Sequence, residues 1–232
     1  MYRSIGTNNL KRHPLTFSII LTLIAGMVLC AVPVQGISAQ TDFFMQSGQP
    51  LYSARTSDYR SGYAAQYSAV LRTLAGGAKP EFGSVGGEWK VLALARSGFY
   101  PTQSGYFSEY YAKIEKLVAA NGLPKLHPQK STENSRLIIA LSSIGRDARS
   151  VAGFDLTAPL GDFNYVKKQG LNGVIFALIA LDCNKDYGMS DIKSQCVDLL
   201  LSRECDGGGW ALGLGAAEAD ITAMAITALA PY

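Results

Sequence analysis

Residues 172–182, with the sequence NGVIFALIALD, decide the fold, because they are apolar almost throughout and three other stretches align with them without gaps. The first residues of the four stretches lie at positions 88, 135, 172 and 220, so the mean spacing between 88 and 220 is 44 residues. A period of this size is typical of a repeated helical hairpin. The three matching stretches are EWKVLALARSG at 88–98, SRLIIALSSIG at 135–145 and DITAMAITALA at 220–230.

Segments of a second kind separate these apolar stretches. The clearest is 105–120, GYFSEYYAKIEKLVAA, whose large apolar side chains recur at the i, i+3, i+4 and i+7 positions of one helix face. Residues 190–205 repeat the arrangement, with Ser190 as a candidate N-cap. A segment before Leu74 and a shorter one that opens at Thr157 are similar.

The alternation of the two kinds of helix predicts an all-α protein with two layers. A helix that is apolar nearly all round must be surrounded, whereas a helix that is apolar on one side faces solvent with the other. We therefore expect an inner and an outer layer of helices that curve into a solenoid or close into a ring. Gly98, Gly122 and Gly145 are expected to end helices. No stretch shows the sustained two-residue alternation of a strand.

The amino terminus has the pattern of a secretory signal. Residues 1–14 carry three positive charges, 15–34 are uncharged, and small residues follow up to Ala39. The uncharged run is also long enough to span a bilayer, so an uncleaved anchor with Lys11 and Arg12 in the cytoplasm is the alternative. Either way we expect an exported protein, extracellular or at the cell surface.

The charge balance excludes a nucleic-acid binder of the ordinary kind. The net charge of +3 comes from Arg3, Lys11 and Arg12, because the remaining 18 basic residues are matched by 18 acidic ones. A neutral body lacks the phosphate neutralisation that supplies most nucleic-acid affinity.

Three cysteines follow the leader, namely Cys183, Cys196 and Cys205. Export permits a disulfide, yet the number is odd and no Cys-x-x-Cys spacing indicates a metal site. One bridge with a free thiol and three buried thiols are both compatible with the sequence.

The end of the chain resembles a known family. The runs DGGGWAL at 206–212, DITAMA at 220–225 and ALAPY at 228–232, with GGEW at 86–89, are similar to the terpenoid cyclase and protein prenyltransferase α/α toroid superfamily. Within that superfamily, the chain resembles the prenyltransferase and squalene oxidase repeat proteins exported to bacterial surfaces. The resemblance implies a ring of six hairpins with the inner helices around a central cavity.

About four of those six hairpins are present, so we expect the toroid to be incomplete and further hairpins or domains to belong to the full chain. The expected organisation is a signal peptide or anchor at 1–39, a linker at 40–56 and an incomplete α/α toroid at 57–232.

The chemistry that the superfamily uses is missing from the sequence. The Asp-x-Asp-Asp acid motif of the cyclases and the Asp-Asp-x-x-Asp motif for magnesium diphosphate do not occur. A zinc site of Asp, Cys and His is not expected, because His127 is the only histidine after the leader and lies far from the cysteines. Residues 182–188 begin like a calcium loop but have Tyr187 where glycine is needed. We expect no catalytic residue, metal or cofactor.

A ligand site is expected where the inner helices begin. In a toroid Glu88, Ser135, Asn172 and Asp220 would gather at one end of the central cavity, and we expect Glu88, Trp89, Asn172 and Asp220 to line the ligand site at this rim. The structural alternative is that carboxylates stabilise the positive ends of helices. Tyrosines could stack on a glycan or pack in the core; they are Tyr59, Tyr63, Tyr67, Tyr106, Tyr110 and Tyr111.

These observations favour an exported, non-catalytic binding or surface module whose ligand is a small molecule, a glycan or a surface protein. The alternative is an isoprenoid cyclase or prenyltransferase-like enzyme whose catalytic residues lie outside this chain. A structural scaffold without a small ligand is a third interpretation.

Overall fold

The fold comes from a computed structural model, which describes the backbone of residues 53–83, 86–97 and 105–232 and the side chains from residue 63 onward within these ranges. The described chain is helical and contains no strand, which confirms the all-α prediction. The predicted leader at 1–39, most of the linker and Gly98 lie outside the described residues. The helices are α2 (Ser53–Gly76), α3 (Glu88–Arg96), α4 (Tyr106–Asn121), α5 (Ser131–Ser143), α6 (Phe163–Val166), α7 (Gly170–Asp182), α8 (Ser190–Leu201) and α9 (Ala219–Leu229).

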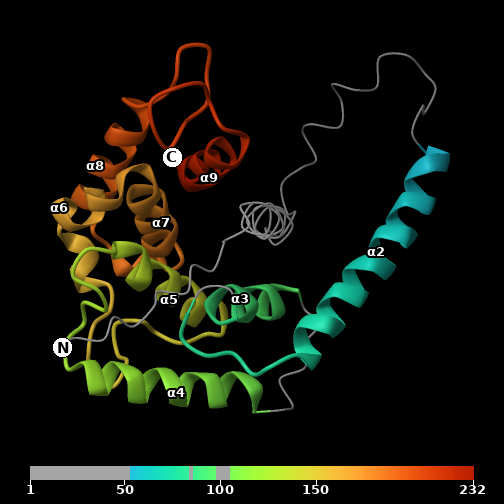
Figure 1. Cartoon of the computed structure of the whole chain (residues 1–232), viewed down its shortest axis with the longest axis horizontal. Helices are drawn as coiled ribbons and strands as arrows, with labels where there is room; N and C mark the ends of the chain where they lie inside the picture. Colours follow the sequence, from blue (N-terminus) through green and yellow to red (C-terminus); the bar gives the residue numbers. More distant parts are fainter. Residues whose placement is uncertain (1–52, 84–85, 98–104) are drawn as a thin grey trace, which may run out of the picture.

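The four apolar stretches form one continuous row of helices. Helix α3 packs on α5, α5 packs on α7, and α7 packs on α9 (Figure 1). Helix α7 is the centre of the row, since it also contacts α8 and most of its side chains are buried. Helix α5 starts at Ser131 rather than at 135, so its first turn is more polar than the aligned stretch suggests. The sequence therefore predicted correctly that these four stretches are helical.

The amphipathic segments pack against this row with one face. On α4 the buried residues are Tyr106, Tyr110, Ile114 and Val118, which recur every four residues. On α8 they are Cys196 and Leu200. Each of these two helices thus buries a single stripe of residues, as expected for a helix whose other side faces solvent.

The predicted helix ends are partly correct. Gly122 ends α4 in the left-handed conformation, with a φ of 67°, and its N–H donates to the Val118 carbonyl. The prediction that Ser190 caps α8 is wrong, because Met189 is the cap residue and Ser190 is already helical. The Ser190 hydroxyl lies 3.4 Å from the Asp191 carboxylate instead.

The outer segment that opens at Thr157 is a chain of short turns. A 3-10 turn at Ala158–Gly161 leads into α6, which is followed by a second 3-10 turn at Lys167–Gln169. The Asp162 side chain caps α6 by accepting a hydrogen bond from the Tyr165 N–H. The α-helix of this segment, with four residues, is thus far shorter than α4 or α8.

Helix α2 contacts the row only near its carboxyl end. Leu71 is buried in a small cluster with Leu94 and Tyr106, while α2 extends away from the other helices (Figure 1). It begins at Ser53, so helix reaches into the stretch that was expected to be a linker. No helix in the described part of the chain combines the length and apolarity needed to cross a bilayer.

Helix α7 approaches its neighbours closely at Gly173. A Cβ atom at this position would lie 2.0 Å from the Val166 carbonyl oxygen and 3.1 Å from the Ser131 Oγ atom. Both neighbours are held in place, since Ser131 is fully buried and its hydroxyl donates to that same carbonyl. Only glycine fits there.

We expect Gly173→Ala to destabilise the protein by about 1–3 kcal/mol, because the methyl group overpacks a fixed contact. In an open helix the same change would stabilise the protein by up to about 1 kcal/mol. The sign of the change in unfolding free energy therefore tells whether the added methyl group meets a close contact. Urea unfolding measures the difference. The matched control is Gly161→Ala, where a Cβ atom meets nothing within 4 Å. Equal stability of the two variants would contradict the close approach.

Candidate functional site

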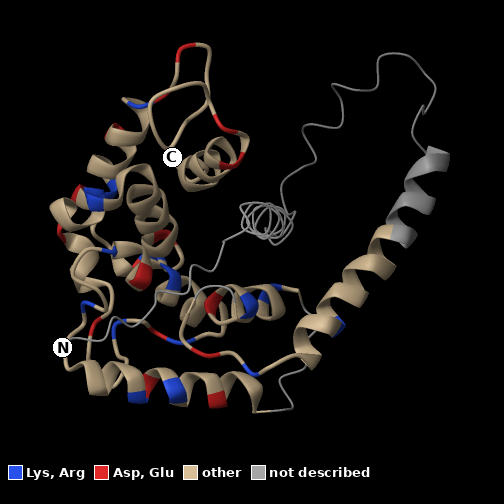
Figure 2. Cartoon of the chain, in the orientation of Figure 1, with Lys and Arg blue, Asp and Glu red and all other residues tan. Residues whose placement is uncertain are grey.

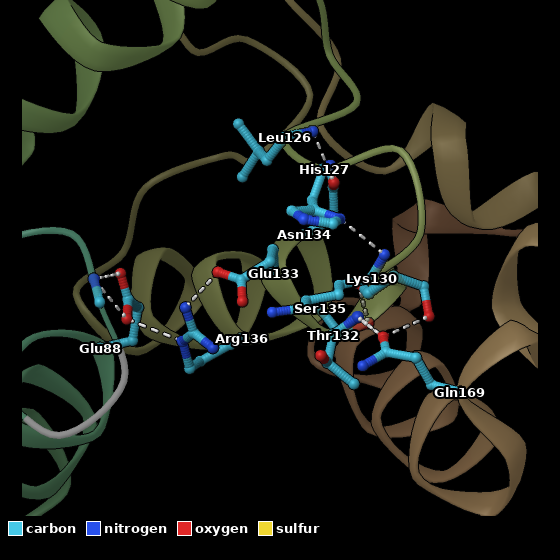
Figure 3. A network of polar contacts seen from close by, with 12 residues as sticks. Glu88, Leu126, His127, Lys130, Thr132, Glu133, Asn134, Ser135, Arg136 and Gln169 are labelled. Atoms are coloured by element: carbon cyan, nitrogen blue, oxygen red, sulfur yellow. Dashed lines mark hydrogen bonds and ion pairs between the residues drawn. The ribbon is translucent and has the colours of Figure 1, made fainter. Parts of the chain in front are cut away.

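The strongest polar constellation lies where α3 and α5 begin, and Glu88 is its centre. The Glu88 side chain is fully buried. Its carboxylate accepts hydrogen bonds from the Arg136 Nε atom at 2.8 Å and from the Gly83 N–H at 3.1 and 3.2 Å (Figure 3). The Tyr110 hydroxyl lies 3.5 Å from the same carboxylate. Both carboxylate oxygens are therefore engaged by donors of the protein itself.

Arg136 joins Glu88 to a second carboxylate. Its Nη2 atom donates to Glu133 Oε2 at 2.6 Å, one turn earlier on α5. Burial alone would lower the pKa of Arg136, but Glu88 and Glu133 outweigh burial and raise that pKa above its usual value. Burial, and then the charge of Glu88, raise the pKa of the Tyr110 hydroxyl. The Arg136 guanidinium and the Tyr110 hydroxyl therefore keep their protons at neutral pH.

This constellation suits a structural role better than ligand contact. An acid that serves catalysis or binding needs an open side, whereas Glu88 is closed on every side by α3, α4, α5 and the Gly83 backbone. A buried carboxylate with three donors holds helices together. Of the expected site residues, Glu88 therefore links α3 to α5 instead of facing a cavity.

The other three expected site residues are partly exposed and lie on different helices. Trp89 on α3 packs against Phe176 on α7, with ring centres 5.6 Å apart. Asn172 lies one turn before Phe176 on α7. Asp220, in the first turn of α9, accepts from the N–H of the next residue. The structure thus brings Trp89 close to the α7 face that carries Asn172 and Phe176.

A second polar network connects the starts of α5 and α7. Asn134 accepts from the Leu126 N–H and donates to the carbonyls of Pro124 and Leu156. Gln169 accepts from the Thr132 N–H at 3.0 Å (Figure 3). These side chains satisfy loop carbonyls and helix-end N–H groups that would otherwise be unpaired in the interior.

His127 belongs to this network through its ring. The Nδ1 atom accepts hydrogen bonds from the N–H groups of Gln129 and Lys130, at 3.0 and 3.1 Å. One ring nitrogen is consequently used to shape the loop before α5. Among the described residues no three His, Cys, Asp or Glu side chains are grouped as metal ligands.

The turn that begins like a calcium loop is held by an ion pair. Lys193 on α8 lies 2.8 Å from the Asp182 carboxylate, which also accepts from the Tyr232 hydroxyl at 3.1 Å. Asn184 caps the following 3-10 turn by accepting from the Asp186 N–H. Asp182 thus connects the end of α7 to α8 and to the end of the chain, and Asn184 stabilises the 3-10 turn between them.

The glycine-rich run before α9 makes room for Trp210. The indole N–H of Trp210 donates to the Leu200 carbonyl at 2.8 Å, and its ring is buried. A Cβ atom at Gly209 would lie 2.8 Å from both the Ala217 Cβ and the Thr222 Oγ1 atoms. Trp210 thus packs against the end of α8, while Gly209 lets the chain approach Ala217 and Thr222 closely.

The tyrosines divide between core and surface. Tyr106 and Tyr110 are buried, so neither is available to stack on a glycan. Tyr63 is 67% exposed and its ring stacks on Tyr67 with centres 6.3 Å apart. The side chain of Tyr59 lies outside the described residues.

All three described cysteines are free thiols in this structure. Cys196 is fully buried between α8 and α7, and burial raises its pKa to about 12. Burial likewise raises the pKa of Cys183 to about 11. The Cys205 Sγ atom lies 3.7 Å from the Gly215 carbonyl in the loop before α9. The second alternative, three buried thiols, agrees with the absence of a bridge among the described cysteines, but only Cys196 is fully buried, while Cys183 and Cys205 are partly exposed.

Comparison of the chain with protein-family models, with curated proteins and with solved structures finds no match.

Sequence reasoning missed Arg136, Glu133 and Tyr110 as partners of Glu88. Glu133 and Arg136 have the three-residue spacing of a helical ion pair, which was a usable signal. Nothing in the sequence pairs Arg136 with a residue 48 positions away. That contact follows only from the packing of α3 on α5.

We expect Arg136→Met to destabilise the protein by about 3–5 kcal/mol, because it leaves the buried Glu88 carboxylate without its cation. The double variant E88Q/R136M should be more stable than R136M alone, since the uncompensated charge is gone. Urea unfolding of the wild type, E88Q, R136M and the double variant measures the coupling. Arg149→Met, at an exposed ion pair with Asp147, is the control and should change little. Additive losses in the double variant would contradict the buried pair.

We expect iodoacetamide to alkylate Cys205 in the folded protein before Cys183 and Cys196, because the raised pKa values of the latter two leave little thiolate at pH 8. Site-resolved mass spectrometry after timed labelling gives the order. Labelling in urea is the control, since unfolding should equalise the three rates. A protected pair that becomes reactive only after reduction would contradict the free-thiol arrangement.

Proposed function

We propose that the protein is an exported binding or surface module built on a repeated helical hairpin of the α/α toroid type. The observation that carries the proposal is the unbroken row α3, α5, α7 and α9, with α8 packed on α7 and the buried face of α4 in the same hydrophobic core. A hairpin repeat that places alternate helices in an inner and an outer layer produces such a row. The secretory pattern at residues 1–39 supports export.

A binding role is favoured over catalysis by how the polar groups are used. Glu88 is enclosed by Arg136 and Tyr110, Asp182 is paired with Lys193, and His127 accepts two backbone N–H groups. Each of these side chains stabilises the fold at an element end. Groups engaged in this way are poorly placed to donate or accept protons for a substrate.

The inner row also offers a surface on which a ligand could rest. Trp89 and Phe176 are half-buried and packed together, with Asn172 one turn away on α7. An aromatic pair beside an amide suits a small molecule or a sugar ring, because the rings supply apolar contact area and the amide supplies hydrogen bonds. This surface is the preferred location for a small ligand of the module.

Export is tested with the full chain carrying an epitope tag after Tyr232 in a bacterial host. We expect protease added to spheroplasts to degrade the tag, because the apolar run at 15–34 directs the chain across the membrane. Release into the medium or periplasm indicates a cleaved signal, and retention in the membrane indicates an anchor. Deletion of 15–34 is the control and should keep the tag protected. A protected tag on the full chain would refute export.

A further inference from the structure

Tyr165 in α6 joins its own segment to the loop before α5. Its hydroxyl lies 2.7 Å from the His127 carbonyl and 3.1 Å from the Lys130 carbonyl. Its ring lies beneath the Lys125 ammonium group, 4.2 Å from the nitrogen to the ring centre. Burial raises the pKa of Tyr165 to about 12, so the hydroxyl keeps its proton and continues to donate. Residues 122–130 and 162–169 therefore form one surface.

This surface, the lysine face, is strongly biased in charge. It carries Lys125, Lys130, Lys167 and Lys168 against the single carboxylate of Asp162, a net charge of 4 − 1 = +3. Lys130, Lys167 and Lys168 are exposed, and in the described part of the chain none of the four lysines forms an ion pair. Along α4, by contrast, lysines and glutamates alternate (Figure 2).

The acidic groups nearest the lysine face are already engaged. Asp162 accepts from the Tyr165 N–H, and Glu133 binds Arg136. Asp155 accepts from the N–H and the hydroxyl of Thr157. Helices α5 and α7 begin directly after residues 122–130 and 162–169. The positive ends of their helix dipoles therefore add to the positive potential of the lysines.

We propose that the lysine face binds a linear polymer with repeated phosphate groups. Several unpaired ammonium groups on one rigid surface can each neutralise a phosphate of such a polymer and release its counterions. A lipid surface is a less suitable partner for the lysine face. Segments that bind membrane surfaces insert several large apolar side chains, whereas at this face Leu123 alone is largely exposed, at 61%.

The inference gives the proposed surface module a partner, but the two can fail separately. Binding is measured with purified protein, and export is measured in cells. A protein that binds phosphate polymer but stays inside the cell would refute export alone, and the reverse result would refute the lysine face alone.

The test uses inorganic polyphosphate and the full chain kept in nonionic detergent because of its apolar run. We expect K167Q/K168Q to bind at least about tenfold more weakly than the wild type. The slope of log affinity against log salt should fall in magnitude from about 3, for four lysines that each neutralise a phosphate, to about 1.5 for two. Each neutralised phosphate of a single strand contributes about 0.7 to this slope. The two side chains are exposed, so folding should be unaffected, and circular dichroism verifies this.

The matched control is R146Q/K185Q, which removes two positive charges that follow the opposite ends of α5 and α7. It should bind polyphosphate like the wild type. Equal losses in the two double variants would overturn the proposal, because they would show an effect of total charge. No binding by the wild type, or tighter binding to single-stranded DNA of equal phosphate number than to polyphosphate, would overturn it as well.

Discussion

The ion pair between Arg136 and Glu88 is the constraint on which the first half of the structure depends. It joins α3 to α5 across 48 residues of sequence, with both side chains withdrawn from solvent. Two charges in a protein interior are tolerated only when each is matched by close partners. The Gly83 N–H, Tyr110 and Glu133 complete the set, so the position of α4 and of the loop before α3 is fixed by the same group of contacts.

Polar contacts also lie near the starts of the other helices in the row α3, α5, α7 and α9. Asn134 satisfies backbone groups of Leu126, Pro124 and Leu156, and Gln169, just before α7, accepts from the Thr132 N–H in the first turn of α5. Before α9, the Trp210 backbone N–H donates to the Thr222 hydroxyl. Each helix of the row α3, α5, α7 and α9 therefore begins near a polar junction and continues through an apolar body. The junctions determine how neighbouring hairpins are spaced, while the apolar bodies supply most of the stabilisation. The surface around Trp89 and Phe176 is held by helices α3 and α7, whereas the lysine face is held by two segments that Tyr165 joins.

Much of the fold was predictable from periodicity, and the polar site was not. The apolar stretches at 172–182 and 220–230 correspond to α7 and α9 almost residue for residue, because a helix buried on all sides has few positions for polar side chains. The role of Glu88 depended on which helix lies opposite, and that information is non-local. Helix N-termini also attract acids for local reasons, so Glu88 and Asp220 looked alike in sequence although one is buried in a network and the other is partly exposed.

The positions of the two tryptophans give the molecule a pair of built-in optical reporters. Trp89 lies on α3 at one end of the helical row, whereas Trp210 lies between α8 and α9 at the other. In a quasi-linear array each repeat contacts only its neighbours, so the two ends can lose structure at different denaturant concentrations. The intrinsic fluorescence of this chain thus contains two spatially separate signals, and their coincidence or divergence reports directly on the cooperativity of the array.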